Sequence, residues 1–434
     1  MASIILAAGK GTRMHSQLPK VLHRVLGRPL VLFPVQLASE LGARPIVAVV
    51  GHGAEELRAV LPPAIQVAVQ PEQLGTADAV RVGLAALGEF DGAVLVLSGD
   101  VPLLTRQTVE RLLELPGPMA LVTAPAPDPT GYGRVVRGRD GRIERVVEER
   151  DAMAAQRRIG EINAGIYRFD AAFLRASLGS VGTENAQHEL YLTDLVAKAA
   201  AAGGVSNISA NLAEVSGVND RRELSSAEAA LRARVNADHQ RRGVTLVDPA
   251  ATYIDLDVEI GEDVTIEPGC VLTAGSVIAE GTTIRAHSVI EGARVGRGSV
   301  IGPFARLRPG TQLGPGVHIG NFVETKNARI GEGSKANHHS YLGDVEIGQR
   351  VNVGAGTITC NYDGEKKSLT RIGDGVFIGS DTQLVAPVSV GAGAYVGAGT
   401  TVQEDVPEDS LVFTRAPRVV KEGWAKRKRE KAKS

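Results

Sequence analysis

A six-residue repeat constrains the fold of this chain more than any other feature. Aliphatic residues recur at every sixth position from residue 260 onward, with slips between runs. They are Ile260, Ile266, Leu272, Ile278, Ile284, Ile290, Val295, Ile301, Leu307, Leu313, Ile319, Ile330, Leu342, Ile347, Val353, Ile372, Ile378, Leu384, Val390, Val396 and Val402. Such hexapeptides are typical of a parallel β-helix, in which one aliphatic side chain on each side of a triangular coil points into a thin core. At three hexapeptides a coil, the stretch to Pro407 provides roughly eight coils, and more if residues 245–258 join it.

Three segments interrupt this rhythm. Residues 357–371 (TITCNYDGEKKSLTR) are polar and basic, as an extruded loop would be. Residues 321–331 (NFVETKNARIG) carry Glu324 and Lys326, and residues 335–344 (KANHHSYLGD) place two histidines side by side. Loops held by a rigid scaffold are where binding groups concentrate, so these breaks argue against a β-helix that is only a spacer or an oligomerising scaffold.

The first half of the chain alternates β-rich runs with helical patterns. SIILAA, PIVAVVG, AVLVLSGD and MALVTA read as strands, and LVLFPVQLASELG and ADAVRVGLAALG as helices. This alternation favours βαβ units and a mostly parallel sheet covered on both faces. Apolar residues then recur at helical spacing in a charged segment. We expect an α/β domain at 1–220, a connecting helix at 221–243, a β-helix domain at 244–407 and a solvated basic tail at 408–434.

The N-terminal segment LAAGKGTRMHSQLPK has the composition of a phosphate-binding turn. Gly9 and Gly11 allow backbone amides to approach a ligand closely, while Arg13 and Lys20 add positive charge. The G-x-x-x-x-G-K-[ST] motif is absent, and G-x-G-x-x-G fails because Met14 replaces the third glycine. Asp100 ends the apolar run in LVLSGDVPL, at the sheet edge where open α/β sheets bind ligands. A carboxylate there suits Mg2+, which combines few protein oxygens with water and substrate phosphates.

Composition excludes some classes of partner. The formal net charge is −1, so the molecule has no bulk attraction for nucleic acid or anionic lipid. The apolar run at the N-terminus is too short to span a membrane and lacks a preceding basic region, so we expect neither a membrane partner nor a signal peptide. Two cysteines form no disulfide framework or zinc motif, which favours a reducing cytoplasm.

The motifs together resemble a known family. LAAGKGTRM with LPK, QPEQLGTADA, SGDVPL, GYGR, EINAGIY and VSGVND look like those of sugar-phosphate nucleotidyltransferases. With the hexapeptides added, the whole chain resembles the bacterial bifunctional N-acetylglucosamine-1-phosphate uridyltransferase / glucosamine-1-phosphate acetyltransferase family. The resemblance implies an α/β Rossmann-like domain, a left-handed parallel β-helix and a homotrimer. It also implies Mg2+, UTP and acetyl-CoA, with production of UDP-N-acetylglucosamine for peptidoglycan.

The resemblance assigns roles in the first half. The residues that would line the uridine and phosphate site are Leu6, Ala7, Ala8 and Gly9, with Arg13 on the triphosphate and Lys20 nearby. Those that would hold the uracil are Gln70, Gln73, Gly75 and Thr76. Asp100 and Asn219 would bind Mg2+, and Gly133, Glu148 and Asn163 would hold the sugar.

Some of these residues have simpler explanations, and two positions depart from the family pattern. Asn219 is also suited to a turn, and Glu148 lies in a charged run that a solvated face would explain. Ser98 stands where we expect Tyr, and Ala164 stands where Thr is common. Neither departure removes a charged group, so the expected effect is confined to the sugar site.

The second half resembles the acetyltransferase of the same family. His338 matches the family base in K-x-x-H-x-x-Y-L-G-D, and a histidine suits the removal of a proton from a sugar ammonium because imidazoles titrate near neutral pH. Glu324 is expected to orient its imidazole. The residues that would hold glucosamine 1-phosphate are Arg308, Lys326, Tyr341, Asn352 and Lys367. Those that would contact acetyl-CoA are Ala355, Asn361, Tyr362, Ser380, Ala398 and Arg415.

Two other functions fit parts of the sequence. A nucleotidyltransferase whose β-helix only oligomerises would leave His338, Lys326 and the Asn361 loop without a use. A non-enzymatic scaffold with a degenerate first domain is disfavoured because Asp100 and Lys20 are both present. The neighbouring His339 is expected on the coil surface, with a smaller role than His338.

Overall fold

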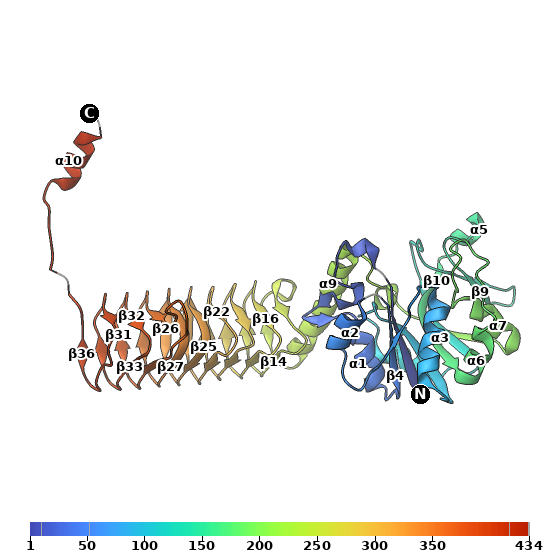
Figure 1. The fold of residues 1–434 in the computed structure, drawn as a ribbon, viewed down its shortest axis with the longest axis horizontal. Helices are drawn as coiled ribbons and strands as arrows, with labels where there is room; N and C mark the ends of the chain where they lie inside the picture. The colour runs from blue at the N-terminus through green and yellow to red at the C-terminus, as the bar shows by residue number, and fades with distance from the viewer. Residues whose placement is uncertain (10, 52, 416, 433–434) are drawn as a thin grey trace. The chain divides into compact units, whose positions relative to one another are not determined.

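The computed structural model describes residues 1–434 apart from 10, 52, 416 and 433–434, and it divides into two compact units. Unit 1 is Met1–Arg232 and unit 2 is Ala233–Ser434. The division falls inside helix α9 (Arg221–Arg241), the segment expected to be a connecting helix (Figure 1). Within the described residues no helix is long and apolar enough to cross a membrane.

Unit 1 is built on a nine-stranded sheet with the order β11-β7-β10-β6-β1-β4-β5 and a side hairpin of β8 and β9. Its strands are β1 (Ala2–Ala7), β4 (Ile46–Val50), β5 (Gln66–Val69), β6 (Ala93–Ser98), β7 (Met119–Pro125), β8 (Arg134–Arg137), β9 (Ile143–Val147), β10 (Glu161–Asp170) and β11 (Val205–Ser209). Strand β1 pairs in parallel with β4 and β6, and β10 runs antiparallel between β6 and β7. A small separate ribbon pairs β2 (Arg24–Val25) with β3 (Arg28–Pro29).

Helices cover both faces of this sheet, as the alternating pattern predicted. They are α1 (Leu32–Glu40), α2 (Ala54–Val60), α3 (Thr76–Leu87), α4 (Arg106–Leu113), α5 (Ala154–Arg157), α6 (Ala171–Leu178), α7 (Asp194–Ala202) and α8 (Leu212–Val215). Ile5 of β1 packs in a core with residues of α1, α2 and α4, whereas Ile4 packs with α3, α6 and α7. Successive side chains of a strand point to opposite faces, so one apolar run serves two cores.

Unit 2 is a parallel β-helix (Figure 1). One face is a ten-stranded sheet of β12 (Thr245–Leu246), β15 (Thr265–Ile266), β18 (Thr283–Ile284), β21 (Val300–Ile301), β24 (His318–Asn321), β26 (Lys335–His338), β28 (Asn352–Val353), β31 (Phe377–Ile378), β34 (Tyr395–Val396) and β36 (Leu411–Val412). The strand β12 comes from the weakly repetitive 245–258 stretch, which therefore joins the β-helix.

The other two faces form one 15-stranded sheet, because two strands of 7 residues each run across both faces. Their strands are β13 (Tyr253–Ile254), β14 (Glu259–Ile260), β16 (Val271–Thr273), β17 (Val277–Ile278), β19 (Val289–Glu291), β20 (Arg294–Val295), β22 (Arg306–Leu307), β23 (Gln312–Leu313), β25 (Glu324–Ile330), β27 (Tyr341–Ile347), β29 (Ile358–Cys360), β30 (Thr370–Ile372), β32 (Gln383–Val385), β33 (Val388–Val390) and β35 (Thr401–Val402). The aliphatic positions of the repeat lie in one continuous core, with Ile260 only partly buried against it.

Two boundaries differ from those expected. Residues 358–360 and 370–372 belong to strands β29 and β30, so the extruded loop is shorter than 357–371. Thr359 is 1% exposed and points inward in place of an aliphatic residue, which hid the strand from the six-residue pattern. Past residue 407, β36 still pairs with β34, and Trp424–Lys431 forms the exposed helix α10 instead of a purely irregular tail.

Candidate active sites

The ends of β1 and β6 define the first site, in unit 1. Leu6 pairs with Ser98 in the sheet, and the amide of Gly99 donates to the carbonyl of Leu6 at 2.8 Å. The residues after both strands are therefore brought to the same edge, where open sheets bind ligands. A cavity of about 230 Å³ opens beside this edge, lined by Leu6, Ala8, Gly9, Gln70, Gln73, Gly75, Thr76, Ala79 and Glu189.

Most residues expected to bind the nucleotide line this cavity, and hydrogen bonds fix several of them. Gln73 donates through Nε2 to the carbonyl of Ala8. Gln70, which is buried, donates to Asp78 at 2.7 Å and to the carbonyl of Gly75 at 3.3 Å. A Cβ at Gly75 would lie 2.5 Å from the carbonyl oxygen of Leu190, and its φ is +122°, so only glycine fits this turn. Ala7 points into the core beside the cavity.

Lys20 lies between the two residues expected to hold a metal. Its Nζ donates to Oδ2 of Asp100 and, at 3.1 Å, to Oδ1 of Asn219. A cationic ammonium between a carboxylate and an amide oxygen shows that these two side chains form a place suited to positive charge. Arg13 lies in the short helix Thr12–Met14, close to Lys20 in sequence. Its side chain is exposed and does not line the cavity.

The oxygen donors of Asp100 and Asn219 fit Mg2+. Among the described residues, no three His, Cys, Asp or Glu side chains gather in a group that would hold a metal by themselves. Mg2+ is commonly bound by one or two protein oxygens and completes its octahedron with water and phosphate oxygens. The pair is therefore sufficient in chemistry and number for a metal that arrives with a nucleotide.

The three residues expected at the sugar converge at one end of the β8–β9 hairpin. The amide of Asn163 donates to the carbonyl of Gly133 at 2.9 Å, and the Asn163 side chain donates to Tyr167 at 2.6 Å. Glu148 follows β9, and a Cβ at Gly133 would lie 3.4 Å from both of its carboxylate oxygens. Glu148 is therefore part of a convergent site and not of the solvated face that its charged run also allowed.

Burial raises the pKa of Glu148, and neighbouring acids add to the effect. Thr193 opposes the rise by donating to Oε1 at 2.9 Å, while Asp151, Asp194 and Glu189 contribute negative charge. Sequence reasoning missed Thr193 and Glu189, which lie together in QHELYLTD. The two positions that depart from the family pattern also lie here, since Ala164 is buried beside Asn163 and Ser98 donates weakly, at 3.5 Å, to the carbonyl of Gly165.

A corner of the β-helix defines the second site, in unit 2. His338 ends β26 and Tyr341 begins β27, and His339 between them has φ +42°. His338 Nδ1 lies 2.8 Å from Oδ1 of Asn321, its partner on the preceding coil. The expectation that Glu324 orients this imidazole is wrong for the described chain, because Glu324 pairs instead with Arg308 at 2.8 Å. His339 is exposed on the coil surface, as expected, and its ring lies tilted beside that of Phe322, with centroids 5.0 Å apart.

The register of the strands places His338 in one column with three residues expected at acetyl-CoA. Asn321 pairs with His338, and the pairs of the next coils extend this column through Ala355, Ser380 and Ala398. Adjacent coils are about 4.8 Å apart, so the three steps from His338 to Ala398 span roughly 14 Å. The column gives an extended ligand a straight path that ends at the imidazole.

Three cations gather on the next sheet. Arg308 and Lys326 each come directly after a residue of the pair Leu307 and Thr325, which lie on adjacent coils. Lys367 reaches them from the extruded loop. The positive charges of Lys367 and Arg308 close by lower the pKa of Lys326. Mutually repelling cations at one place favour a bound phosphate. Tyr341 covers Gly343, where any Cβ would collide with its hydroxyl.

The extruded loop is tied to the YLGD motif. Asn361 donates through Nδ2 to Asp344, whose other oxygen accepts from Asn327 at 2.7 Å. Tyr362 and Lys367 form an isolated antiparallel bridge across the loop. Further along, Arg415 donates to the carbonyl of Ala398 at 2.8 Å.

Asn352 lies on the sheet that ends at the His338 corner. It begins β28, between Lys335 and Phe377 of the neighbouring coils. The other residues expected at the sugar phosphate belong to the sheet that begins at this corner or to the extruded loop. The described chain therefore brings Arg308, Lys326 and Lys367 together. It leaves Asn352 on a different sheet.

Comparisons with known proteins agree with both halves. A MobA-like NTP transferase domain matches residues 3–160, and bacterial transferase hexapeptide repeats match residues 257–292, 292–327 and 369–404. The Bifunctional protein GlmU of Trichlorobacter lovleyi is 49% identical over 99% of both chains, and that of Geobacter sulfurreducens is 47% identical over 99% of both. The GlmU of an Anaeromyxobacter species is 53% identical over 100% of this chain and 94% of its own. With its α/β and left-handed β-helix halves, the chain belongs to the family of bifunctional GlmU proteins.

Proposed function

We propose that this chain acetylates glucosamine 1-phosphate with acetyl-CoA and then transfers UMP from UTP to the product. The final products are UDP-N-acetylglucosamine, which serves peptidoglycan synthesis, and pyrophosphate. The corner of unit 2 is the observation that supports two activities instead of one. There His338 heads a straight column beside three cations, an arrangement for which a purely oligomerising β-helix has no use.

In the acetyl transfer, His338 takes the proton of the sugar amine. An amide oxygen only accepts hydrogen bonds, so the contact with Asn321 Oδ1 places the ring proton on Nδ1 and leaves the Nε2 lone pair available. The amine nitrogen then forms a bond to the thioester carbonyl carbon, the C–S bond breaks, and coenzyme A leaves as the thiol after taking up a proton. Arg308, Lys326 and Lys367 hold the sugar phosphate by charge.

The column positions the other substrate. Ala355, Ser380 and Ala398 are small residues that leave room for the pantetheine arm along the coils, and Asn361 with Tyr362 encloses the acetyl end. Arg415, held at the carbonyl of Ala398, supplies charge for the phosphates of coenzyme A. The thioester is thereby brought to His338 at the head of the column.

In the uridylyl transfer, an oxygen of the sugar 1-phosphate attacks the α-phosphorus of UTP in line with the bond to pyrophosphate, which breaks. Gln70, Gln73, Gly75 and Thr76 hold the uracil in the cavity of unit 1. Asp100 and Asn219 would hold Mg2+, which would supply charge neutralisation at the phosphates. Lys20 and Arg13 add further positive charge, and such reactions depend chiefly on positioning and charge.

The proposed assembly is a homotrimer formed through the β-helix, and the proposed location is the cytoplasm. An exposed aromatic stack supports self-association. Phe304 is 48% exposed and Phe322 52%, and both lie in a column with His287 and His339, with ring centroids 5.0–5.4 Å apart. This stack ends beside His338, so a neighbouring copy seated on it would border the acetyl site.

One assay tests both activities. The purified chain is given glucosamine 1-phosphate, acetyl-CoA, UTP and Mg2+, and a parallel mixture contains N-acetylglucosamine 1-phosphate instead. Free thiol and pyrophosphate are followed separately. We expect thiol only in the first mixture and pyrophosphate in both. Pyrophosphate without thiol would reduce the proposal to a nucleotidyltransferase, and neither product would contradict it entirely.

A further inference from the structure

An ion pair between the buried Arg134 and the half-buried Glu149 lies behind the sugar site of unit 1. Arg134 begins β8 and pairs in register with Val147, the last residue of β9. Gly133 immediately precedes β8 and Glu148 immediately follows β9, so they are the next facing pair at this end of the hairpin. Because successive residues of paired strands face opposite sides, Gly133 and Glu148 share one side of the hairpin end while the side chains of Arg134 and Glu149 share the other.

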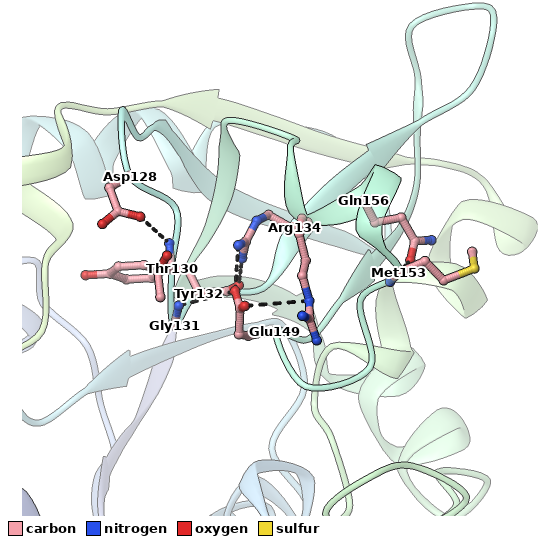
Figure 2. A network of polar contacts seen from close by, with 9 residues as sticks. Asp128, Thr130, Gly131, Tyr132, Arg134, Glu149, Met153 and Gln156 are labelled. Carbon is pink, nitrogen blue, oxygen red and sulfur yellow. Dashed lines mark hydrogen bonds and ion pairs between the residues drawn. The ribbon is translucent and has the colours of Figure 1, made fainter.

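The guanidinium of Arg134 is enclosed by protein. Its side chain is 2% exposed, and Nη2 lies 2.5 Å from Oε2 of Glu149. Its Nη1 donates to the carbonyl of Tyr132. The hydrogen bond from Arg134 is the main cause that lowers the pKa of Glu149, so this carboxylate is ionised at neutral pH. Figure 2 shows both side chains directed toward each other beside the Asp128–Tyr132 loop.

The pair ties this loop to the end of β9. Glu149 Oε2 also accepts from the amide of Gly131 at 3.3 Å, and Arg134 holds the next carbonyl along the chain, that of Tyr132. This one ion pair therefore anchors the three residues before Arg134 at two points, the amide of Gly131 and the carbonyl of Tyr132. Breaking it would free the backbone immediately before Gly133.

The position of Gly133 determines the space above Glu148. A Cβ added at Gly133 would lie 2.8 Å from Val146 Cγ1 and 3.4 Å from the Glu148 carboxylate oxygens. The carbonyl of Gly133 also accepts from Asn163 at 2.9 Å. A shift of Gly133 would therefore disturb the three proposed sugar contacts together.

We propose that Arg134 and Glu149 are positioning residues that set the geometry of the sugar site by anchoring Gly131–Gly133 against the end of β9. This inference rests on the proposed uridylyl transfer and adds two residues to it. Neither side chain touches the sugar, and they act through Gly133 and Glu148. The expected signature is a selective loss of affinity for N-acetylglucosamine 1-phosphate.

The test separates positioning from simple stabilisation of the fold. Replacing Glu149 leaves the buried charge of Arg134 without its partner, whereas replacing both residues of such a pair with apolar residues of similar volume is often neutral for stability. The double variant Arg134→Met/Glu149→Met should therefore unfold at a temperature closer to that of the wild type than Glu149→Met does. It still lacks both anchors of the loop, so its KM for N-acetylglucosamine 1-phosphate should remain about tenfold above the wild-type value.

Other readouts serve as internal controls. In the double variant, the KM for UTP and the rate of thiol release by the acetyltransferase should stay within about twofold of the wild-type values. The matched control is Arg137→Met/Glu161→Met, which removes the ion pair of 2.7 Å formed by the last residue of β8. This control should leave the KM for the sugar phosphate unchanged.

A conservative variant keeps the test valid if the double variant does not fold. Glu149→Gln retains an oxygen that can accept from Gly131 and Arg134, so its sugar KM should rise less than that of Glu149→Met. A wild-type sugar KM in a folded Glu149→Met or double variant would overturn the positioning role. If the wild-type chain itself released no pyrophosphate, the proposed function would fall, and this inference with it.

Discussion

The two units assemble their sites by different means. In unit 1, Lys20 meets Asp100 and Asn219 across 80 and 199 residues of sequence. In unit 2, Asn321 and His338 are 17 residues apart on adjacent coils. A parallel β-helix converts sequence spacing directly into position, whereas strand ends in an α/β sheet meet through loops that need individual anchors. The units should therefore respond independently, and differently, to substitution.

Loss of the proposed base should have the largest effect. His338→Ala removes the group that accepts the amine proton, so thiol release should fall by about 10²–10⁴-fold. Pyrophosphate release from supplied N-acetylglucosamine 1-phosphate should be unchanged, because the residues proposed to support it lie in unit 1. Steady-state thiol and pyrophosphate assays on the same preparation measure both.

The neighbouring histidine provides the matched control. His339 has φ +42° and lies on the coil surface, so His339→Asn retains a residue type that tolerates this backbone conformation. Its thiol release should stay close to that of the wild type. A larger loss in His339→Asn than in His338→Ala would show that the roles of the two histidines are reversed.

Removal of the metal should affect only unit 1. Chelation with EDTA, or the substitution Asp100→Asn, should reduce pyrophosphate release by about 10²-fold or more, since a metal contributes several kcal/mol of charge stabilisation to such reactions. Thiol release should persist. A parallel loss of thiol release in a folded protein would contradict the independence of the two sites.

The smallest expected effect concerns Glu148 and has two parts. Glu148→Gln removes a charged group proposed to hydrogen-bond the sugar, so the KM for N-acetylglucosamine 1-phosphate should rise about tenfold. Burial raises the pKa of Glu148 in the folded state, so the folded protein holds this proton more tightly than the unfolded chain does. The contribution of Glu148 to stability is therefore greatest at acid pH and falls as the pH rises from the ordinary carboxyl range through the raised value.

The variant should consequently be more thermostable than the wild type at neutral pH, and this advantage should shrink at acid pH. Calorimetric melting of both proteins across this range measures the difference. A melting-temperature difference that does not vary with pH would show that the buried carboxyl is not the cause.

The six-residue pattern allowed much of unit 2 to be predicted, because an inward position in a thin coil must be filled. The pattern failed where a polar residue occupies the inward position. Thr359 is buried, accepts from the amide of Gly343 at 2.8 Å and donates to its carbonyl at 2.9 Å, so an inward position of β29 read as part of a loop.

Individual polar partners were harder to predict than elements. Glu324, Arg308 and Asn321 all lie near the corner, and the choice of Arg308 for Glu324 and of Asn321 for His338 depends on rotamers that periodicity does not specify. The same holds for Thr193 beside Glu148 and for the pairing of Arg134 with Glu149. Motifs located both regions, but the side chains that orient the motif residues lie outside those motifs.

The straight column from His338 to Ala398 fixes a distance along unit 2. In the proposed mode of binding, the number of coils between the imidazole and Arg415 fixes how long an acyl carrier must be for its thioester to reach the proposed base while its phosphates meet Arg415. Inserting one whole coil would keep every side chain facing the same way but lengthen the required carrier by about 4.8 Å. Carrier length, as well as carrier chemistry, is therefore a property that this fold can select.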